Sequence, residues 1–303
     1  MDERQRENLR RLAEDGIHFD CLMARYTTFR VGGAAEAVYE ADNLENLRRV
    51  ITYLSREQSP YLVVGRGSNL LVKDGGLEGM VIVLRGSLAS VKTDTTNALT
   101  VLGTGGLSLS DLLAYCRLSG LGGLEFLAGI PGTLGGAVAM NAGAFGKDIS
   151  ERVEEVHLLR ATGDVIVMDR TDLNFSYRGL RMDTDNVIVA SRLRVNLESR
   201  EKVAERISGY LMRRKKTQPI EYPSAGSVFK NPSHDYAVRL VEAAGLKVKK
   251  IGGAMISEKH ANYIVNTGGA TAKDILALLS LAQEKVMTET GVKLDLEIRV
   301  VGK

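Results

Sequence analysis

The segment GLGGLEFLAGIPGTLGGAVAMNAGAFG, residues 120–146, carries more structural information than any other part of this chain. It has nine glycines and five alanines in 27 residues, and no helical or strand period runs through it. Each glycine costs backbone entropy on folding, so this many glycines indicate a backbone that must lie very close to something. A phosphate-bearing cofactor and tight packing between two elements both require such an approach.

Two more glycine-rich segments lie upstream, at Gly65–Leu71 (GRGSNLL) and at 103–106 (GTGG). Three such turns between apolar runs predict a fold that surrounds a ligand, whereas a flexible linker or a repeat lacks the apolar runs. In Gly65–Leu71, open backbone N–H groups, the Ser68 hydroxyl and the Asn69 amide suit a phosphate. The turn lacks the third glycine of the G-x-G-x-x-G dinucleotide fingerprint, and Asp74 follows too soon to bind the ribose. A plain structural turn is the alternative.

Composition places the chain among ordinary water-soluble proteins. Its 303 residues can form two domains or three, and 44% hydrophobic with 25% charged residues is a typical balance. A net charge of +3 gives no reason to expect nucleic acid as a partner, although it suits an anionic substrate. Two cysteines, Cys21 and Cys116, form no disulfide framework or metal motif and indicate a reducing compartment. No apolar run approaches the ~20 residues of a membrane span, so we expect a cytoplasmic protein without a metal or a membrane contact.

Hydrophobic spacing predicts an α/β arrangement followed by a compact α+β unit of about ninety residues. The expected boundary lies near 197–217. Helices are expected at 1–16, 43–58, 108–119, 199–215, 235–244 and 271–288. Strands are expected at 38–40, 61–64, 80–84, 89–92, 98–102, 186–196, 252–256, 262–265 and 293–301, with a hairpin formed by 153–160 and 164–168.

Three side chains are candidates for chemistry, each with a structural alternative. Arg178, in Phe175-Ser176-Tyr177-Arg178, could clamp a carboxylate with its planar guanidinium, or be an ordinary surface arginine. Ser227, in a turn of small residues, is a better candidate for a proton donor than for a nucleophile because no G-x-S-x-G elbow surrounds it, and a purely structural turn is the alternative. Glu297 lies on the polar face of the last strand, which solvent alone would explain. The run Arg213–Lys216 is typical of a solvated helix end.

Taken together, these segments resemble the UDP-N-acetylenolpyruvoylglucosamine reductase (UDP-N-acetylmuramate dehydrogenase) family, flavoenzymes of bacterial peptidoglycan precursor synthesis. The resemblance covers roughly residues 20–302 and looks like the shorter subtype without an inserted substrate loop. Six motifs carry it in the family's order: TTFRVGG at 27–33, GRGSNLL at 65–71, GIPGTLGGAVAMNAG at 129–143, SYR at 176–178, AGSVFKNP at 225–232, and Glu297.

The resemblance implies an FAD-binding fold of the vanillyl-alcohol-oxidase type, with two α/β subdomains over residues 1–204 that divide near 85–90. A substrate-binding domain over 205–303 would follow. The implied reaction is NADPH-dependent reduction of a UDP-sugar enolpyruvate through FAD. We expect the FAD to be non-covalent, because the only thiol near a motif, Cys116, lies in a predicted helix. A monomer is favoured.

The resemblance also implies residue roles. Arg178 would bind the substrate carboxylate, Glu297 would polarise it, and Ser227 would protonate carbon C2. Substrate contacts are expected from Tyr177, Lys216, Lys230 and Asn231, with His260 and Asn262 at the rim. Cofactor contacts are expected from Arg30, Gly65, Arg66, Gly67, Ser68, Asn69, Leu70, Gly129, Pro131, Gly132, Thr133, Gly135, Gly136, Asn141, Ala142 and Gly143. An FAD-dependent alcohol oxidase and a non-catalytic nucleotide-binding protein are the competing hypotheses.

Overall fold

Capping residues set the ends of the main helices in the computed structural model, which describes residues 1–93 and 98–303. Helix α3 (Leu109–Ser119) begins at Ser108, whose hydroxyl accepts from the Asp111 N–H, and ends at Gly120 in the left-handed region. Helix α7 (Ala272–Thr290) begins with a capping box at Thr271 and ends at Gly291. Side-chain caps and left-handed glycines satisfy backbone groups that a helix end leaves without partners. The predicted helices at 108–119 and 271–288 are therefore confirmed.

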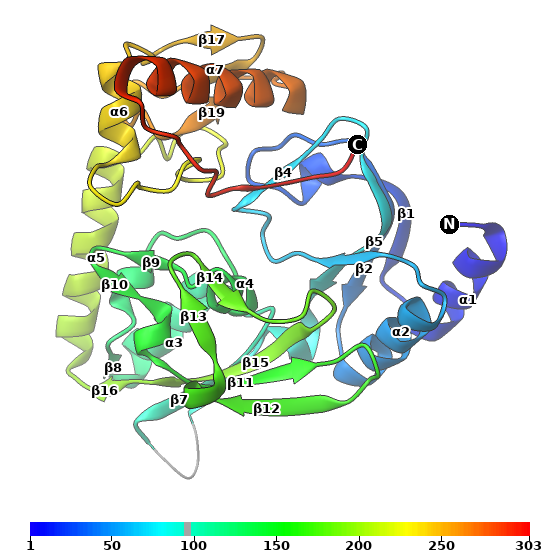
Figure 1. Ribbon diagram of the computed structural model, residues 1–303. Helices are drawn as coiled ribbons and strands as arrows, with labels where there is room; N and C mark the ends of the chain where they lie inside the picture. The colour runs from blue at the N-terminus through cyan, green and yellow to red at the C-terminus, as the bar shows by residue number, and fades with distance from the viewer. Residues whose placement is uncertain (94–97) are drawn as a thin grey trace. The chain divides into compact units, whose positions relative to one another are not determined.

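The first compact unit comprises Met1–Asp20, Glu36–Gly65 and Glu78–Met212 and contains two sheets (Figure 1). The strands of its first sheet run in the order β1-β2-β5-β3. They are β1 (Ile17–Leu22), β2 (Ala34–Ala41), β3 (Tyr61–Val63) and β5 (Leu77–Leu84). Helix α2 (Leu44–Arg56) connects β2 to β3, and β3 pairs in parallel with β5. Leu9 of α1 (Glu3–Ala13) and Leu47 of α2 are fully buried in the apolar cluster that includes Met80 of β5.

The second sheet of this unit is antiparallel, with the order β12-β11-β15-β7-β6. Its strands are β6 (Val91–Thr93), β7 (Thr100–Thr104), β11 (Val153–Leu159), β12 (Val165–Asp169) and β15 (Val187–Arg194). His157 lies opposite Val167, which confirms the hairpin predicted at 153–160 and 164–168. Helix α3 packs its apolar side into the same cluster as the central strand β15.

The glycine-rich segment packs against this second sheet through its short helix α4 (Leu134–Ala139). The Gly135 N–H donates to the Gly105 carbonyl oxygen at 2.8 Å. A Cβ added at Gly105 would lie 2.1 Å from the Ile188 carbonyl oxygen. Glycine at position 105 lets the turn after β7 approach β15 more closely than any side chain would permit, and α4 bonds to that turn.

The second unit comprises Cys21–Ala35, Arg66–Leu77 and Arg213–Lys303. Strand β4 (Leu70–Val72) pairs in parallel with β20 (Arg299–Val301), so Leu71 lies opposite Val300. Phe29 and Leu71 are buried in one core with helix α7. Its other elements are α6 (Ala237–Ala243), β17 (Lys250–Ile251), β18 (Ala254–Ile256) and β19 (Ile264–Asn266), the last three forming an antiparallel sheet.

This division of the chain differs from the one expected from the sequence. The boundary between the two units lies inside α5 (Arg200–Thr217), after Met212, within the expected range 197–217. Segments 21–35 and 66–77, however, belong to the C-terminal unit, although the sequence analysis places them in the FAD-binding region. The β4–β20 pairing and the burial of Phe29 account for this, and both join residues more than two hundred positions apart.

The remaining elements are short. Three two-stranded ribbons pair β8 (Leu121–Gly122) with β16 (Asn196–Leu197), β9 (Gly143–Ala144) with β10 (Lys147–Asp148), and β13 (Asn174–Ser176) with β14 (Gly179–Arg181). Single 3-10 turns occur at Met23–Arg25, Gly86–Ala89, Glu125–Leu127, Ile149–Glu151 and Arg170–Asp172.

The last predicted strand, 293–301, is wrong over most of its length. Only Arg299–Val301 form a strand, while Leu296 makes an isolated bridge to Phe229. Leu294 and Ile298 are nevertheless buried, as the alternation requires. The pattern of period two was therefore correct for burial, whereas the extended segment lacks a continuous partner strand.

We expect Gly105→Ala to lower the free energy of unfolding by about 3 kcal/mol, because the added methyl group would collide with the Ile188 carbonyl. Gly209→Ala is the matched control: nothing lies within 4 Å of an added Cβ there, in the interior of α5. It should raise the stability by about 0.5–1 kcal/mol, since alanine is the better helix former. Urea denaturation followed by circular dichroism measures both changes. Equal stability of Gly105→Ala and the wild type would contradict the close packing described here.

Candidate functional site

The turn Gly65–Leu70 is shaped by close backbone contacts on both sides. A Cβ added at Gly65 would lie 2.4 Å from the Thr133 Oγ1, so the first glycine packs against the capping residue of α4. Gly67 has φ +59°, and a Cβ there would lie 2.2 Å from the Tyr26 carbonyl oxygen. The positive φ of Gly67 and the nearby Tyr26 carbonyl oxygen together exclude any other residue at this position unless the backbone rearranges locally. The two glycines therefore fix the path of the turn.

Several backbone N–H groups in two glycine-rich segments donate no hydrogen bond within residues 1–93 and 98–303. Gly67 is buried and Thr133 is only 4% exposed, and neither N–H donates a hydrogen bond to any residue in the ranges 1–93 and 98–303. The N–H groups of the neighbouring Arg66 and Ser68 likewise have no acceptor among these residues. Buried backbone donors nearly always find acceptors, and runs of them bind anions. Each of the two segments, considered alone, therefore suits the phosphate oxygens of a nucleotide.

Arg178 lies beside the end of the glycine-rich segment, in what we call the arginine group: Asn141, Gly143, Asp148, Tyr177 and Arg178. The buried Asn141 side chain donates to the Ser176 carbonyl oxygen at 2.9 Å. Gly143 pairs with Asp148 in the β9–β10 ribbon, and Arg178 Nη1 donates to Asp148 Oδ1 at 3.4 Å. The Arg178 guanidinium also lies 4.9 Å from the centre of the Tyr177 ring. These contacts bring a predicted catalytic residue and three predicted ligand-binding residues together.

Two non-glycine residues of the arginine group adopt left-handed backbone conformations. Asn141 has φ +43° and Arg178 has φ +61°. Asparagine tolerates this region, whereas arginine does so at a cost of roughly 1–3 kcal/mol. Such strain persists where neighbouring contacts enforce it and is typical of functional sites. The surface-arginine alternative for Arg178 does not explain a half-buried side chain held in this way.

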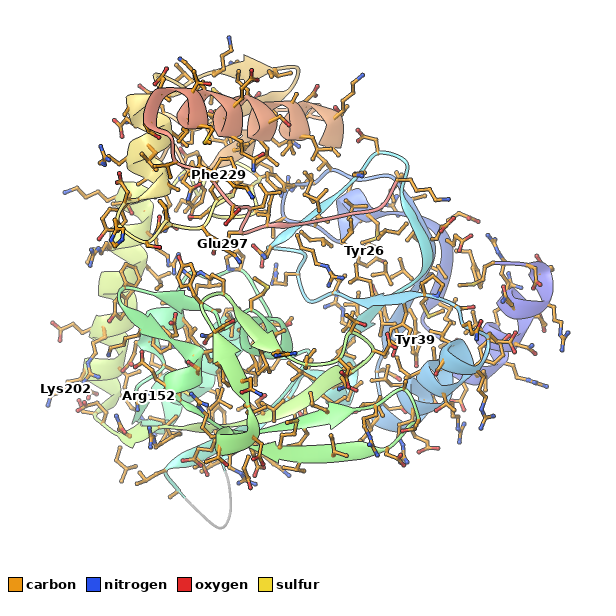
Figure 2. The ribbon with its side chains drawn as sticks, in the orientation of Figure 1. Tyr26, Tyr39, Arg152, Lys202, Phe229 and Glu297 are labelled. Atoms are coloured by element: carbon orange, nitrogen blue, oxygen red, sulfur yellow. The ribbon has the colours of Figure 1, made fainter. Side chains whose placement is uncertain are left out.

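Ser227 and Glu297 lie on two segments joined by backbone hydrogen bonds. The Glu297 N–H donates to the Val228 carbonyl oxygen at 2.9 Å, and the Lys230 N–H donates to the Asp295 carbonyl oxygen at 2.9 Å. Asn69 of the glycine turn adds a third segment, since its Nδ2 donates to the Glu297 carbonyl oxygen at 3.0 Å. Figure 2 shows Phe229 and Glu297 beside each other. We call residues Asn69, Ser227, Lys230, Asn262 and Glu297 the serine group.

Asn262 has a supporting role that the sequence did not indicate. Its Oδ1 accepts from the Phe229 N–H at 3.0 Å, and its Nδ2 donates to the Phe229 carbonyl oxygen at 2.8 Å. The side chain is 3% exposed. It therefore fixes the segment that carries Ser227, and its contact with substrate stays a prediction.

Other predicted substrate residues lie elsewhere in the second unit. Lys216 is exposed in the last turn of α5. Asn231 is exposed, and its Oδ1 accepts from the Ala237 N–H at the start of α6. The His260 ring packs edge-on against Tyr263 at 4.8 Å, and burial lowers the pKa of His260, so the imidazole is neutral at pH 7.

The remaining predicted cofactor residues follow the chain through both units. Arg30 is exposed with φ +56°, and Pro131 is exposed. Gly129 has φ +75°, and the Gly132 carbonyl oxygen accepts from the Leu109 N–H. The Gly136 N–H donates to Oγ1 of Thr133, which caps α4. Ala142 bonds back to Ala137, and Leu70 begins β4. Their contacts with a cofactor stay predictions.

One residue of the site carries no sequence signal, and another differs from its prediction. Asp148, the partner of Arg178, was not singled out. Arg214 was placed in a solvated run, but in the structure it is only 9% exposed and donates to Gln218 Oε1 at 3.1 Å. The run spans more than one helical turn, so a period of 3.6 residues could have indicated that one of its members faces inward.

No cluster of three or more histidine, cysteine or acidic side chains suited to a metal ion occurs among the residues that the structure describes. Among the helices in those residues, none has the length and apolar character needed to cross a bilayer.

Comparisons with known proteins cover almost the whole chain. The family model described as an FAD binding domain matches residues 34–169, and the model for the C-terminal domain of UDP-N-acetylenolpyruvoylglucosamine reductase matches residues 218–301. The UDP-N-acetylenolpyruvoylglucosamine reductase of Geobacter metallireducens is 43% identical over 282 residues, which cover 93% of this chain and 92% of that protein. The enzyme of the same name from Anoxybacillus flavithermus is 39% identical and covers 99% of each chain.

A solved structure agrees with these matches. The crystal structure of UDP-N-acetylenolpyruvylglucosamine reductase from Thermus caldophilus superposes with a TM-score of 0.81 at 35% identity, covering 93% of this chain and 98% of that chain. The predicted fold class, an FAD-binding fold of the vanillyl-alcohol-oxidase type with a C-terminal α+β part, is thereby confirmed. Together with relatives that match from end to end, this fold shows that the chain belongs to the UDP-N-acetylenolpyruvoylglucosamine reductase family and is an FAD-dependent oxidoreductase.

Proposed function

We propose that this protein reduces UDP-N-acetylglucosamine enolpyruvate to UDP-N-acetylmuramate with NADPH, through bound FAD, in peptidoglycan precursor synthesis. The observation that carries the proposal is the serine group. A hydroxyl at Ser227 and a carboxyl at Glu297 lie on hydrogen-bonded segments, and Asn69 of the glycine turn is bonded to the same glutamate. This arrangement suits a reaction in which a proton donor and an acid work next to a cofactor turn.

The cofactor is held mainly by backbone. The N–H groups of Gly67 and Thr133 would bind phosphate oxygens, and the glycines of both segments admit the ligand close to the main chain. When bound, FAD supplies hydride transfer from NADPH to the enolpyruvyl double bond. The protein contributes binding, orientation and charge.

Each side chain of the proposed centre has one task. Arg178 binds the substrate carboxylate; its guanidinium has five N–H donors, so the contact with Asp148 is compatible with this. Glu297 polarises the same part of the substrate as negative charge develops there. Ser227 gives its proton to carbon C2. Lys216, Lys230 and Asn231 bind the diphosphate.

The cellular setting belongs to the same proposal. We infer a monomeric cytoplasmic enzyme that takes a soluble UDP-sugar and no nucleic acid. Two free cysteines, one buried and one half-buried, are consistent with a reducing compartment.

The purified protein should be yellow, and NADPH should bleach its flavin absorbance under argon. Adding UDP-N-acetylglucosamine enolpyruvate should then restore the colour at a rate far above that obtained with air. Stopped-flow absorbance near 450 nm, the usual maximum of oxidised flavin, measures both half-reactions. Restoration by oxygen alone would instead support an FAD-dependent oxidase, and failure to bleach would support a non-catalytic binding protein.

Ser227→Ala should bleach with NADPH at the wild-type rate, while reoxidation by the enolpyruvate substrate should slow by about 10²–10⁴-fold. The reason is that only the second half-reaction needs a proton on carbon, and a positioned acid contributes about that factor. Ser208→Ala, an exposed serine of α5, is the matched control and should match the wild type in both steps. If Ser227→Ala slows both half-reactions equally, Ser227 is not the proton donor.

Acid or guanidinium treatment should release all of the flavin into the supernatant. Covalent attachment through cysteine requires a reactive thiolate, whereas Cys116 is 1% exposed and burial raises its pKa to about 12. Filtration after denaturation, with absorbance measured in both fractions, tests this. Yellow colour that stays with the precipitated protein would show a covalent bond.

A further inference from the structure

The turn of the β9–β10 ribbon carries a bulky residue in a conformation that glycine favours. Ala144 pairs with Lys147, so a two-residue loop, Phe145-Gly146, connects the two strands. Phe145 has φ +57° and Gly146 has φ +79°. Hairpin loops with positive φ at both central residues strongly prefer asparagine followed by glycine, and a phenylalanine adopts such a φ at an energetic cost. The requirements of the turn therefore do not explain the phenylalanine.

A contact with helix α5 does explain it. The Phe145 ring stacks on the Tyr210 ring, with 4.5 Å between the ring centres and 29° between the ring planes. Figure 1 shows the ribbon beside α5. Both side chains are half-buried, and Tyr210 also packs against the apolar cluster of the second sheet. Because stacked rings attract each other beyond their burial, the contact fastens the tip of the ribbon to a helix that is anchored in the core.

The base of the same ribbon holds the partner of Arg178. Asp148 of β10 pairs with Gly143 of β9, and Asp148 Oδ1 accepts from Arg178 Nη1 at 3.4 Å. A Cβ added at Gly143 would collide with the Asp148 carboxylate, so the glycine leaves space for that side chain. The Ile149 N–H donates to the Ala142 carbonyl oxygen at 2.9 Å and extends the connection by one residue. The position of the carboxylate thus follows the position of the ribbon.

We propose that Phe145 and Tyr210 are positioning residues for Arg178: their stack holds the β9–β10 ribbon, and the ribbon presents the Asp148 carboxylate that orients the guanidinium. The inference rests on the proposed role of Arg178 in binding the substrate carboxylate. Asp148 accepts from one N–H group of the guanidinium, and a guanidinium has five such donors. A guanidinium that is already oriented loses less conformational freedom when it binds a carboxylate, and its affinity is higher for that reason.

The first test compares two ligands that differ in the carboxylate. UDP-N-acetylglucosamine enolpyruvate carries the group that Arg178 would bind, and UDP-N-acetylglucosamine lacks it. In the oxidised, flavin-loaded protein, Tyr210→Ala should weaken binding of the enolpyruvate about tenfold, the effect of losing roughly one hydrogen bond to a charged group. Binding of UDP-N-acetylglucosamine should keep its wild-type affinity. Isothermal titration calorimetry measures both, and Tyr210→Phe, which keeps the ring, should match the wild type.

Phe145→Asn separates positioning from folding. Asparagine suits the turn better than phenylalanine, which offsets the loss of the stack, so the melting temperature should stay near that of the wild type. The tenfold loss, confined to the enolpyruvate, should nevertheless appear. Leu211→Ala removes an exposed apolar side chain next to Tyr210 on α5 and is the matched control, with wild-type affinity for both ligands. Equal weakening of both ligands by Tyr210→Ala, or no weakening of either, overturns the proposal.

The second test observes the guanidinium without substrate. With ¹⁵N-labelled arginine, the Arg178 Nε signal is identified by its loss in Arg178→Lys. It should shift in Asp148→Asn and in Tyr210→Ala, and it should keep its place in Tyr210→Phe and in Leu211→Ala. An Arg178 signal that is unaffected by Tyr210→Ala overturns the proposal.

The outcomes separate this inference from the proposed function. A wild type that binds the two ligands with equal affinity refutes the proposed role of Arg178, while the arginine signal still decides whether the stack orients the guanidinium. A wild type that prefers the enolpyruvate, with the same preference in Tyr210→Ala, refutes the positioning role alone.

Discussion

The backbone of Glu297 holds together three parts of the second unit that are distant in sequence. Its N–H bonds to Val228, next to Ser227, and its carbonyl oxygen accepts from Asn69 of the glycine turn. Both bonds use main-chain atoms of Glu297, so neither of them changes with the protonation of its carboxyl group. A backbone frame of this kind is what a preorganised site requires.

In the first unit, the backbone of Arg178 is held in an unusual conformation. Arg178 and Asn141 both have positive φ, and the Asn141 amide bonds to Ser176, two residues before the arginine. A hydrogen-bonded neighbour and the Asp148 carboxylate together enforce a conformation that a free chain would avoid. The strain is local, and the bonds that offset it come from the end of the glycine-rich segment. The same few contacts in this unit thus hold residues that were predicted to bind the cofactor and residues that were predicted to bind the substrate.

Local sequence signals predicted the helices and the hairpin well, but they did not predict which segments belong to which unit. Caps and periodicity gave α3 and α7 and the β11–β12 hairpin, because these depend on neighbours within a few residues. The inclusion of 66–77 in the second unit depends on the pairing of Leu71 with Val300, which no local pattern reveals. In the site, residue type and pattern made Arg178, Ser227 and Glu297 candidates, and the family resemblance supplied their expected roles. Their partners Asp148 and Asn262 lack a local signal, since each acts on a residue about thirty positions away.

Arg214 differs in burial from the other members of the basic run at residues 213–216. Arg213, Lys215 and Lys216 are exposed on α5, whereas Arg214 between them is buried, as expected when four consecutive residues span more than a full helical turn. Burial of a guanidinium is costly unless polar groups meet it, and here the Gln218 side chain accepts a hydrogen bond from Arg214. A core built only for stability would place an apolar side chain at such a position. Packing alone therefore does not explain the burial of Arg214, whereas the hydrogen bond to Gln218, four residues further along the chain, offsets part of its cost.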